Sequence, residues 1–203
     1  MGFMQAPAAG GDFNTFLKYD ARSGRWHTKP DGGGDLYEVE NMTAIFDLEN
    51  IRTGWFQFFE GAAPVKVFDQ SLTEATARPN PDAKKGFEVL VYSEANIGGL
   101  REFTSTAATV IEAMNALYDD WEANRAANPG KLPVVKCVGV QSVKTAKSTN
   151  YRPALEIVTW APRPEGLPVP EGTPPAANAK PAASVRQAAP PPPATAKADE
   201  PVF

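Results

Sequence analysis

Short apolar and aromatic runs of strand length occupy much of the first 160 positions and predict a domain built mainly of β-strands. Aromatic and β-branched residues favour strands, and several of these runs alternate apolar with polar side chains, as a strand with one buried face does. We expect extended segments at residues 13–26 (with a bend at Ser23-Gly24), 43–48, 54–59, 65–68, 87–92, 132–143 and 153–160.

One segment has the periodicity of a helix instead. Between residues 106 and 127 the apolar side chains recur every three or four positions, which places them on one buried face. Thr104 or Ser105 can cap its start, and Pro129-Gly130 ends it. A mainly β fold with one helix inserted before the final hairpin fits a small, partly open, OB-fold-like β-barrel, and the pattern leaves other α+β arrangements open.

The composition changes after Trp160. Of the 20 prolines in the chain, 12 lie at or after Pro162, and almost nothing apolar accompanies them, so an ordered core would cost more than it returned. We therefore expect a flexible N-terminal arm at residues 1–12, a folded domain at 13–162, a disordered Pro/Ala-rich linker at 163–197 and an acidic-hydrophobic tip at 198–203.

The sequence lacks the residues that several classes of function require. His27 and Cys137 are the only histidine and the only cysteine, so a multi-His metal site, a Cys-based zinc cluster and an internal disulfide framework are all excluded. No Walker-type phosphate loop is present, and no apolar stretch has the length of a membrane span or signal segment. We expect a cytoplasmic protein that is not an enzyme, with no cofactor, no metal and no membrane partner.

Charge is segregated along the chain, which the net charge of −4 conceals. Cations interleaved with aromatic residues suit single-stranded nucleic acid, because cations neutralise phosphates while aromatic faces stack on unpaired bases, at roughly 1–3 kcal/mol per stack. The candidate phosphate-binding residues are Lys18, Arg22, Arg25, Arg52, Lys66, Lys144, Lys147 and Arg152. The candidate stacking residues are Trp26, Trp55, Tyr92 and Tyr151, of which the two tryptophans fit the core equally well. We expect the remaining aromatics of this region in the core: Phe56, Phe58, Phe59 and Phe68.

The C-terminal tip carries a second signal. Asp199 and Glu200 precede a terminal Phe203, whose ring can enter an apolar pocket while the carboxylates pair with cations at its rim. A long tether raises the effective concentration of any protein that the tip captures. We expect these three residues to bind a protein partner.

Together these features resemble the single-stranded DNA-binding proteins of bacteriophages and bacteria, and within that group the phage proteins that have a helix before the final hairpin. The matching stretches are FDLENIRTGW at 46–55, GFEVLV at 86–91, REFTST at 101–106, KLPVV at 131–135 and KSTNYRP at 147–153, leading to Trp160.

The resemblance covers roughly residues 13–163 and the tip. It implies an OB-fold, sequence-independent binding of single-stranded DNA in replication, recombination or repair, and recruitment of partner proteins by the tip. This tip has two acids where bacterial tails usually have more, which implies weaker capture. The acidic balance of the domain implies a modest, strongly salt-dependent affinity for DNA.

Two alternatives stay open. The barrel could be the scaffold of a protein-interaction module whose Pro-rich tail, with four consecutive prolines at 190–193, binds partner domains. The ligand could also be RNA, or the protein could anneal complementary strands. The sequence does not indicate an oligomeric state.

Overall fold

The computed structural model describes residues 15–59, 62–144 and 148–169. The predicted N-terminal arm lies outside these residues, as do most of the linker and the whole of the tip. In chain order the elements are β1 (Phe16–Asp20), β2 (Arg25–Thr28), β3 (Tyr37–Glu38), β4 (Thr43–Phe46), η1 (Leu48–Asn50), β5 (Arg52–Phe59), β6 (Ala62–Phe68), β7 (Lys84–Ser93), α1 (Glu94–Ile97), β8 (Gly99–Ser105), α2 (Ala108–Asn124), η2 (Arg125–Ala127), β9 (Lys131–Lys144) and β10 (Thr149–Pro162).

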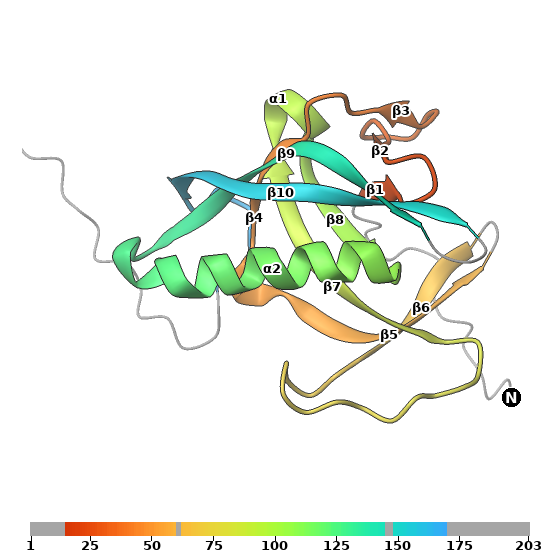
Figure 1. Ribbon diagram of the computed structural model, residues 1–203. Helices are drawn as coiled ribbons and strands as arrows, with labels where there is room; N and C mark the ends of the chain where they lie inside the picture. The colour runs from red at the N-terminus through yellow and green to blue at the C-terminus, as the bar shows by residue number, and fades with distance from the viewer. Residues whose placement is uncertain (1–14, 60–61, 145–147, 170–203) are drawn as a thin grey trace, which may run out of the picture. The chain divides into compact units, whose positions relative to one another are not determined.

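The strands form one curled sheet, resembling half a barrel, with the order β10-β9-β4-β7-β8-β1-β2-β3 (Figure 1). Neighbouring strands are antiparallel except β1 and β8, which run parallel. β7 is long enough to pair with three strands. Its first half pairs with β5, its last residues pair with β4, and β8 lies along its other edge. The β5–β6 hairpin therefore branches away from the main sheet, as Figure 1 shows.

The predicted fold class is confirmed at the level of a mainly β domain with one long helix before the final hairpin. Helix α2 begins two residues later than expected and ends three residues earlier. Its N-cap is Ala107, which has no capping side chain. The Ser105 hydroxyl accepts instead from the backbone N–H of Ala107, at 3.2 Å, so the serine lies just outside the helix.

Strand β8 was not expected from the sequence. Its side chains alternate between buried and half-buried at every position, as a strand with one inward face requires. The inward positions, however, carry Gly99, Arg101, Phe103 and Ser105, so only one of the four is a large apolar residue. The polarity of the residues in β8 therefore does not reveal which of its positions are buried.

The core lies between α2 and the inner face of the sheet. The predicted apolar face of α2 is buried at Val110, Met114, Leu117 and Trp121. From the sheet, aromatic side chains fill the opposite side in tilted or edge-to-face contacts, which are the favourable geometries for aromatic pairs. Their ring centroids lie 4.9–6.3 Å apart in the chain of contacts from Tyr19 through Trp26 and Phe103 to Phe46.

Residues 163–169 belong to the folded unit, although the sequence predicted that the linker begins at 163. Arg163 forms an ion pair at 3.0 Å with Asp47, which is fully buried. The carbonyl oxygen of Pro168 accepts hydrogen bonds from Asn50 (3.0 Å) and Arg163 (2.7 Å), and Leu167 is buried. A buried carboxylate requires a compensating charge, and the segment after β10 supplies it.

Candidate nucleic-acid interface

A groove of about 630 Å³ lies between β1, the end of the β5–β6 hairpin and the residues that precede α2. Two phenylalanines line it with much of their surface exposed: Phe16 is 37% exposed and Phe58 54% exposed. Lys18 and Lys66 also line the groove, and Glu102 is the acidic residue of its wall among the described residues. The groove thus combines aromatic surface with cations at its edge.

The backbone geometry explains why these side chains face the groove. On β1, Leu17 and Tyr19 are buried, so Phe16 and Lys18 lie on the opposite face. On β5, Phe58 follows Phe56 by two positions and lies at an irregularity in the pairing with β6, between Gln57 and Phe59. Phe56 forms the last pair with β7, and Phe58 lies beyond it, where β5 no longer pairs with β7. Phe56 is therefore fully buried whereas Phe58 is exposed.

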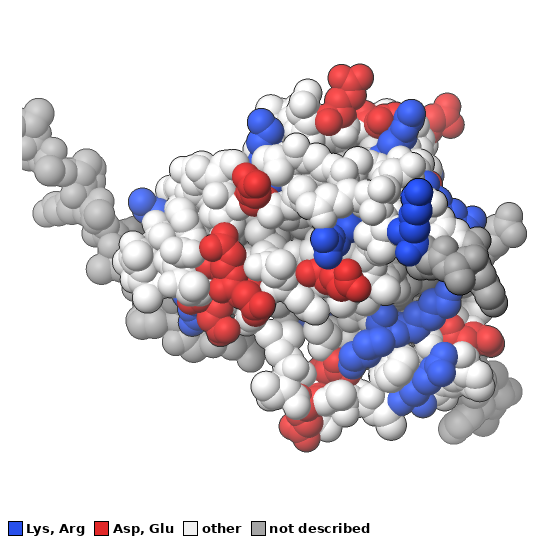
Figure 2. All heavy atoms as spheres, viewed as in Figure 1, with Lys and Arg blue, Asp and Glu red and all other residues white. Residues whose placement is uncertain are grey.

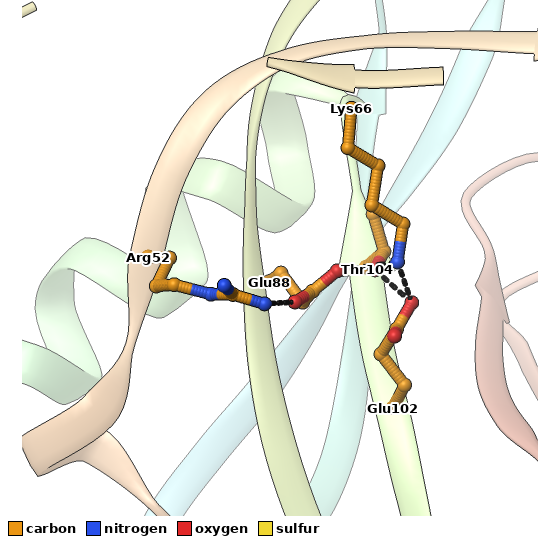
Figure 3. A network of polar contacts seen from close by, with 5 residues as sticks. All are labelled: Arg52, Lys66, Glu88, Glu102 and Thr104. Carbon is orange, nitrogen blue, oxygen red and sulfur yellow. Dashed lines mark hydrogen bonds and ion pairs between the residues drawn. The ribbon is translucent and has the colours of Figure 1, made fainter. Parts of the chain in front are cut away.

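An ion-pair network lies beneath the wall of the groove (Figure 3). The Glu88 side chain, 5% exposed, contacts Arg52 through one oxygen and the Lys66 ammonium group through the other, at 2.5 Å. Lys66 also contacts Glu102, whose carboxylate accepts a hydrogen bond from the Thr104 hydroxyl at 3.2 Å. The register of β5, β7 and β8 places Arg52, Glu88 and Thr104 side by side. A second pocket, of about 410 Å³, adjoins the network and is bounded by Pro168.

Trp55 is attached to the segment between β6 and β7. Its indole N–H donates to the carbonyl oxygen of Thr76 at 2.8 Å, and the cationic groups of Arg78 and Lys85 lie 5.5 and 5.3 Å from its ring centre. Asp69 also binds this segment, because its carboxylate accepts a hydrogen bond from the backbone N–H of Thr76. Burial alone would raise the pKa of Asp69, but hydrogen bonds from Lys85, Thr53 and the backbone N–H of Thr76 outweigh it and hold the pKa below its ordinary value.

The structure corrects the assignment of several aromatic residues. Trp26 is 4% exposed and packs against Tyr19 and Phe103, so neither ring face can receive a base. Conversely Phe58 and Phe59, expected in the core, are about half exposed at the end of the hairpin. The remaining predictions of this kind have mixed outcomes: Phe56 is in the core, Phe68 is half-buried beneath the Arg52 guanidinium, Trp55, Tyr92 and Tyr151 are half-buried, and none of these three lines the groove.

The predicted phosphate-binding cations fall into two groups. Lys18, Arg22 and Lys144 are exposed and form no ion pair within the part of the chain that the structure describes, although the charge of Lys18 lies close enough to Asp20 to help lower the pKa of that carboxyl. Four others are paired: Arg25 with Glu38 (2.9 Å), Arg152 with Glu112 (3.5 Å), and Arg52 and Lys66 in the network of Figure 3. Lys147 and the three tip residues, Asp199, Glu200 and Phe203, lie outside the described residues.

Two chain segments that are distant in the sequence bring the unpaired cations toward one side. The backbone N–H of Tyr151 donates to the carbonyl oxygen of Ala21 at 2.7 Å, and its ring lies against Gly24, where an added Cβ would come within 3.2 Å of it. The start of the β10 strand is thereby held against the β1–β2 turn, which carries Arg22. Figure 2 shows Lys and Arg side chains gathered on the right of the view, whereas Asp and Glu predominate over the left half of α2.

Sequence reasoning missed the residues that distinguish the groove, Phe16 and Phe58. In the sequence, glycine and proline at positions 61 and 64 are typical of a turn, near which an aromatic side chain has few neighbours to bury it. That signal favoured exposure of Phe58. Lys84, an exposed cation that pairs with Phe56 at the start of β7, was not among the predicted residues, and it does not line the groove.

No protein-family model matches the chain, and no curated protein or solved structure shows significant similarity to it. Among the described residues, no cluster of three His, Cys, Asp or Glu side chains is arranged to hold a metal ion. None of the helices in the described ranges combines the length and apolar character needed to cross a bilayer.

Proposed function

We propose that the protein binds single-stranded DNA, independently of sequence, through the groove between β1 and the β5–β6 hairpin. The observation that carries the proposal is the exposure of Phe16 and Phe58 in a groove edged by Lys18, in a domain whose other large aromatics are mostly packed. Exposed aromatic faces stack on any base, and nearby cations bind the phosphates between bases, so this chemistry is suited to binding single strands without reading their sequence.

The path of the strand follows from the residues around the groove. Thr106 and Ala107, which precede α2, line the groove, and the Thr109 hydroxyl donates to the carbonyl oxygen of Tyr151 at 3.2 Å. The end of the groove at Thr106 and Ala107 therefore lies near the start of β10, which is held against the β1–β2 turn. We place the phosphates of the strand along the cations of this path, Lys18, Arg22, Lys144 and Arg152, with Lys147 in the connecting segment.

The curled sheet, with a helix before its last hairpin, is compatible with the OB-fold that the sequence resemblance implies. On this proposal the protein protects single strands during replication, recombination or repair of DNA, in the cytoplasm of a bacterial host if the chain is phage-encoded. Asp199, Glu200 and Phe203 at the end of the tail recruit replication or recombination proteins. Neither catalysis nor a cofactor is part of the proposal.

A protein-interaction module is the second candidate, and the apolar character of the groove favours it. Phe16, Phe58 and Pro64 would equally accept the apolar side chains of an extended peptide. The two candidates differ in their dependence on salt. Binding to DNA releases counterions and weakens steeply as salt rises, whereas binding of an apolar peptide does not.

The test is a titration of fluorescently labelled oligo(dT) with the full chain, followed by anisotropy at several salt concentrations. We expect a complex at low salt that weakens steeply with added salt, and similar affinity for oligonucleotides of mixed sequence. The absence of a complex at low salt would refute the proposal. Much tighter binding of the matching RNA oligonucleotide would indicate that the ligand is RNA and not DNA.

A further inference from the structure

Lys66 lies in the wall of the groove, yet two carboxylates already contact its ammonium group. The side chain is 20% exposed, and Figure 3 shows it reaching from β6 toward Glu88 on β7 and Glu102 on β8. A phosphate that approached Lys66 from the groove would meet Glu102 first, because Glu102 also lines the groove whereas Glu88 does not.

The charges of the network balance as it stands. Arg52 and Lys66 supply two positive charges, and Glu88 and Glu102 supply two negative ones. Glu88 is almost fully buried and must remain paired, but Arg52 alone can compensate it. Glu102 is 22% exposed, and its described partners are Lys66 and the Thr104 hydroxyl. Without Glu102, the remaining network of Arg52, Lys66 and Glu88 would carry a net charge of +1, so it is Glu102 that brings the network to neutrality.

We infer that Glu102 sets the affinity and the salt dependence of the groove for single-stranded DNA, because it occupies the position on Lys66 that a phosphate would take. This inference rests on the proposed function. Carboxylate and phosphate oxygens both accept charge-assisted hydrogen bonds from an ammonium group. In the free protein Lys66 is held by Glu102, so a strand either leaves this cation unused or must displace the carboxylate from it. Glu102 acts through Lys66 and is a positioning residue.

The test is Glu102→Gln, which removes the charge and retains an oxygen that can accept from Thr104. The remaining network of Arg52, Lys66 and Glu88 then carries a net positive charge that a phosphate at Lys66 can neutralise. Each additional phosphate contact on a single strand steepens the slope of log K against log salt by about 0.7. The variant should therefore bind oligo(dT) more tightly at low salt, and its affinity should fall about 2.6-fold further than that of the wild type over a fourfold rise in salt.

Two variants show whether the effect passes through Lys66. In the double variant Lys66→Gln with Glu102→Gln, the Arg52–Glu88 pair remains and the added slope should disappear. Glu38→Gln is the matched control, since it removes one negative charge and frees Arg25 from a pair that lies outside the groove lining. It should change the slope less than Glu102→Gln does. Denaturation curves show that each variant is folded, and Glu102→Thr, which suits a strand, replaces Glu102→Gln if the latter unfolds.

The outcomes separate the two proposals. If the wild type does not bind oligo(dT) at low salt, the proposed function fails and this inference fails with it. If the wild type binds, but Glu102→Gln leaves both affinity and slope unchanged, the inference alone is overturned. An equal gain from Glu38→Gln, or a gain that survives in the double variant, also overturns it, because a general charge effect would then explain the result.

Discussion

The two faces of the curled sheet use aromatic residues in opposite ways. On the inner face Trp26 packs between Tyr19 and Phe103 and is almost completely buried. On the outer side Phe16 and Phe58 leave about a third to a half of their surface open to the groove. The first group stabilises the fold and cannot reach a ligand. The second group contributes little to the core and is free to contact a ligand, so residue type alone does not reveal which role an aromatic plays.

Replacing Trp26 with alanine tests the inner face and should have the largest effect. Truncation of a buried tryptophan leaves a cavity and costs about 3–5 kcal/mol of the free energy of unfolding. Chemical denaturation measures this loss. Because the ring has no face in the groove, the folded fraction of Trp26→Ala should bind oligo(dT) like the wild type. A specific loss of DNA affinity at unchanged stability would reverse the assignment of the two faces.

Arg163→Ala tests whether residues 163–169 contribute to the stability of the folded domain. It leaves the fully buried Asp47 without its cation, and breaking a buried pair in this way costs about 3 kcal/mol or more. A chain that ends at residue 162 should lose similar stability in thermal unfolding, whereas one that ends at 169 should match the full chain. Equal stability of both truncated chains would place the boundary at 162, as the sequence predicted.

Phe58→Ala, compared with Phe59→Ala, tests the outer face directly. Both rings are about half exposed and adjacent in the chain, but only Phe58 lines the groove. Loss of one base stack should weaken oligo(dT) binding by about 1–3 kcal/mol for Phe58→Ala and leave Phe59→Ala close to the wild type. Both variants should retain their unfolding midpoints. Equal effects of the two substitutions would remove the groove from the binding site.

Asp69 allows a finer test by pH and should show the smallest effect. Its pKa is lowered in the folded state from the usual 3.8, so its contribution to stability is complete above that value and is lost as pH falls through the folded pKa. Asp69→Asn should be less stable than the wild type at pH 7 by about 1 kcal/mol, because hydrogen bonds to the carboxylate are lost. The difference in unfolding free energy should shrink below pH 4. A constant difference across that range would contradict the pairing of Asp69.

The elements that could be predicted from the sequence are those whose polarity matches their burial. Helix α2 was predicted because its apolar residues alone determine its buried face, and most strands were predicted for the same reason. Strand β8 was missed because Arg101, buried at 1% exposure, occupies an inward position. Its guanidinium donates to the Thr28 hydroxyl and pairs with Asp31, partners that are distant in the sequence. A buried cation cannot be recognised without its partners.

The binding chemistry inferred from the sequence stays a prediction, and the residues that line the groove are mostly not the ones expected. The interleaving of cations and aromatics suggested the chemistry, and Lys18, Arg22 and Lys144 are exposed without an ion pair among the described residues, so their contact with phosphate stays a prediction. The assignment of Trp26 was wrong because packing, and not neighbouring turn residues, decides whether a ring is exposed. Pairing of Lys66 with Glu88 and Glu102 was equally invisible, since those acids are 22 and 36 positions away.

By itself the sequence determined the mainly β class, the long helix before the final hairpin and the change of composition after Trp160, because periodicity and composition are local properties of the chain. Only the tertiary structure decided which aromatic side chains are exposed and which cations are already in ion pairs. It also decided that residues 163–169 are part of the folded domain. These depend on tertiary packing. Phe56 pairs with both β6 and β7 and is fully buried, whereas Phe58 lies at the irregularity of β5 beyond the last pair with β7 and is exposed, as a ligand contact in our proposal requires.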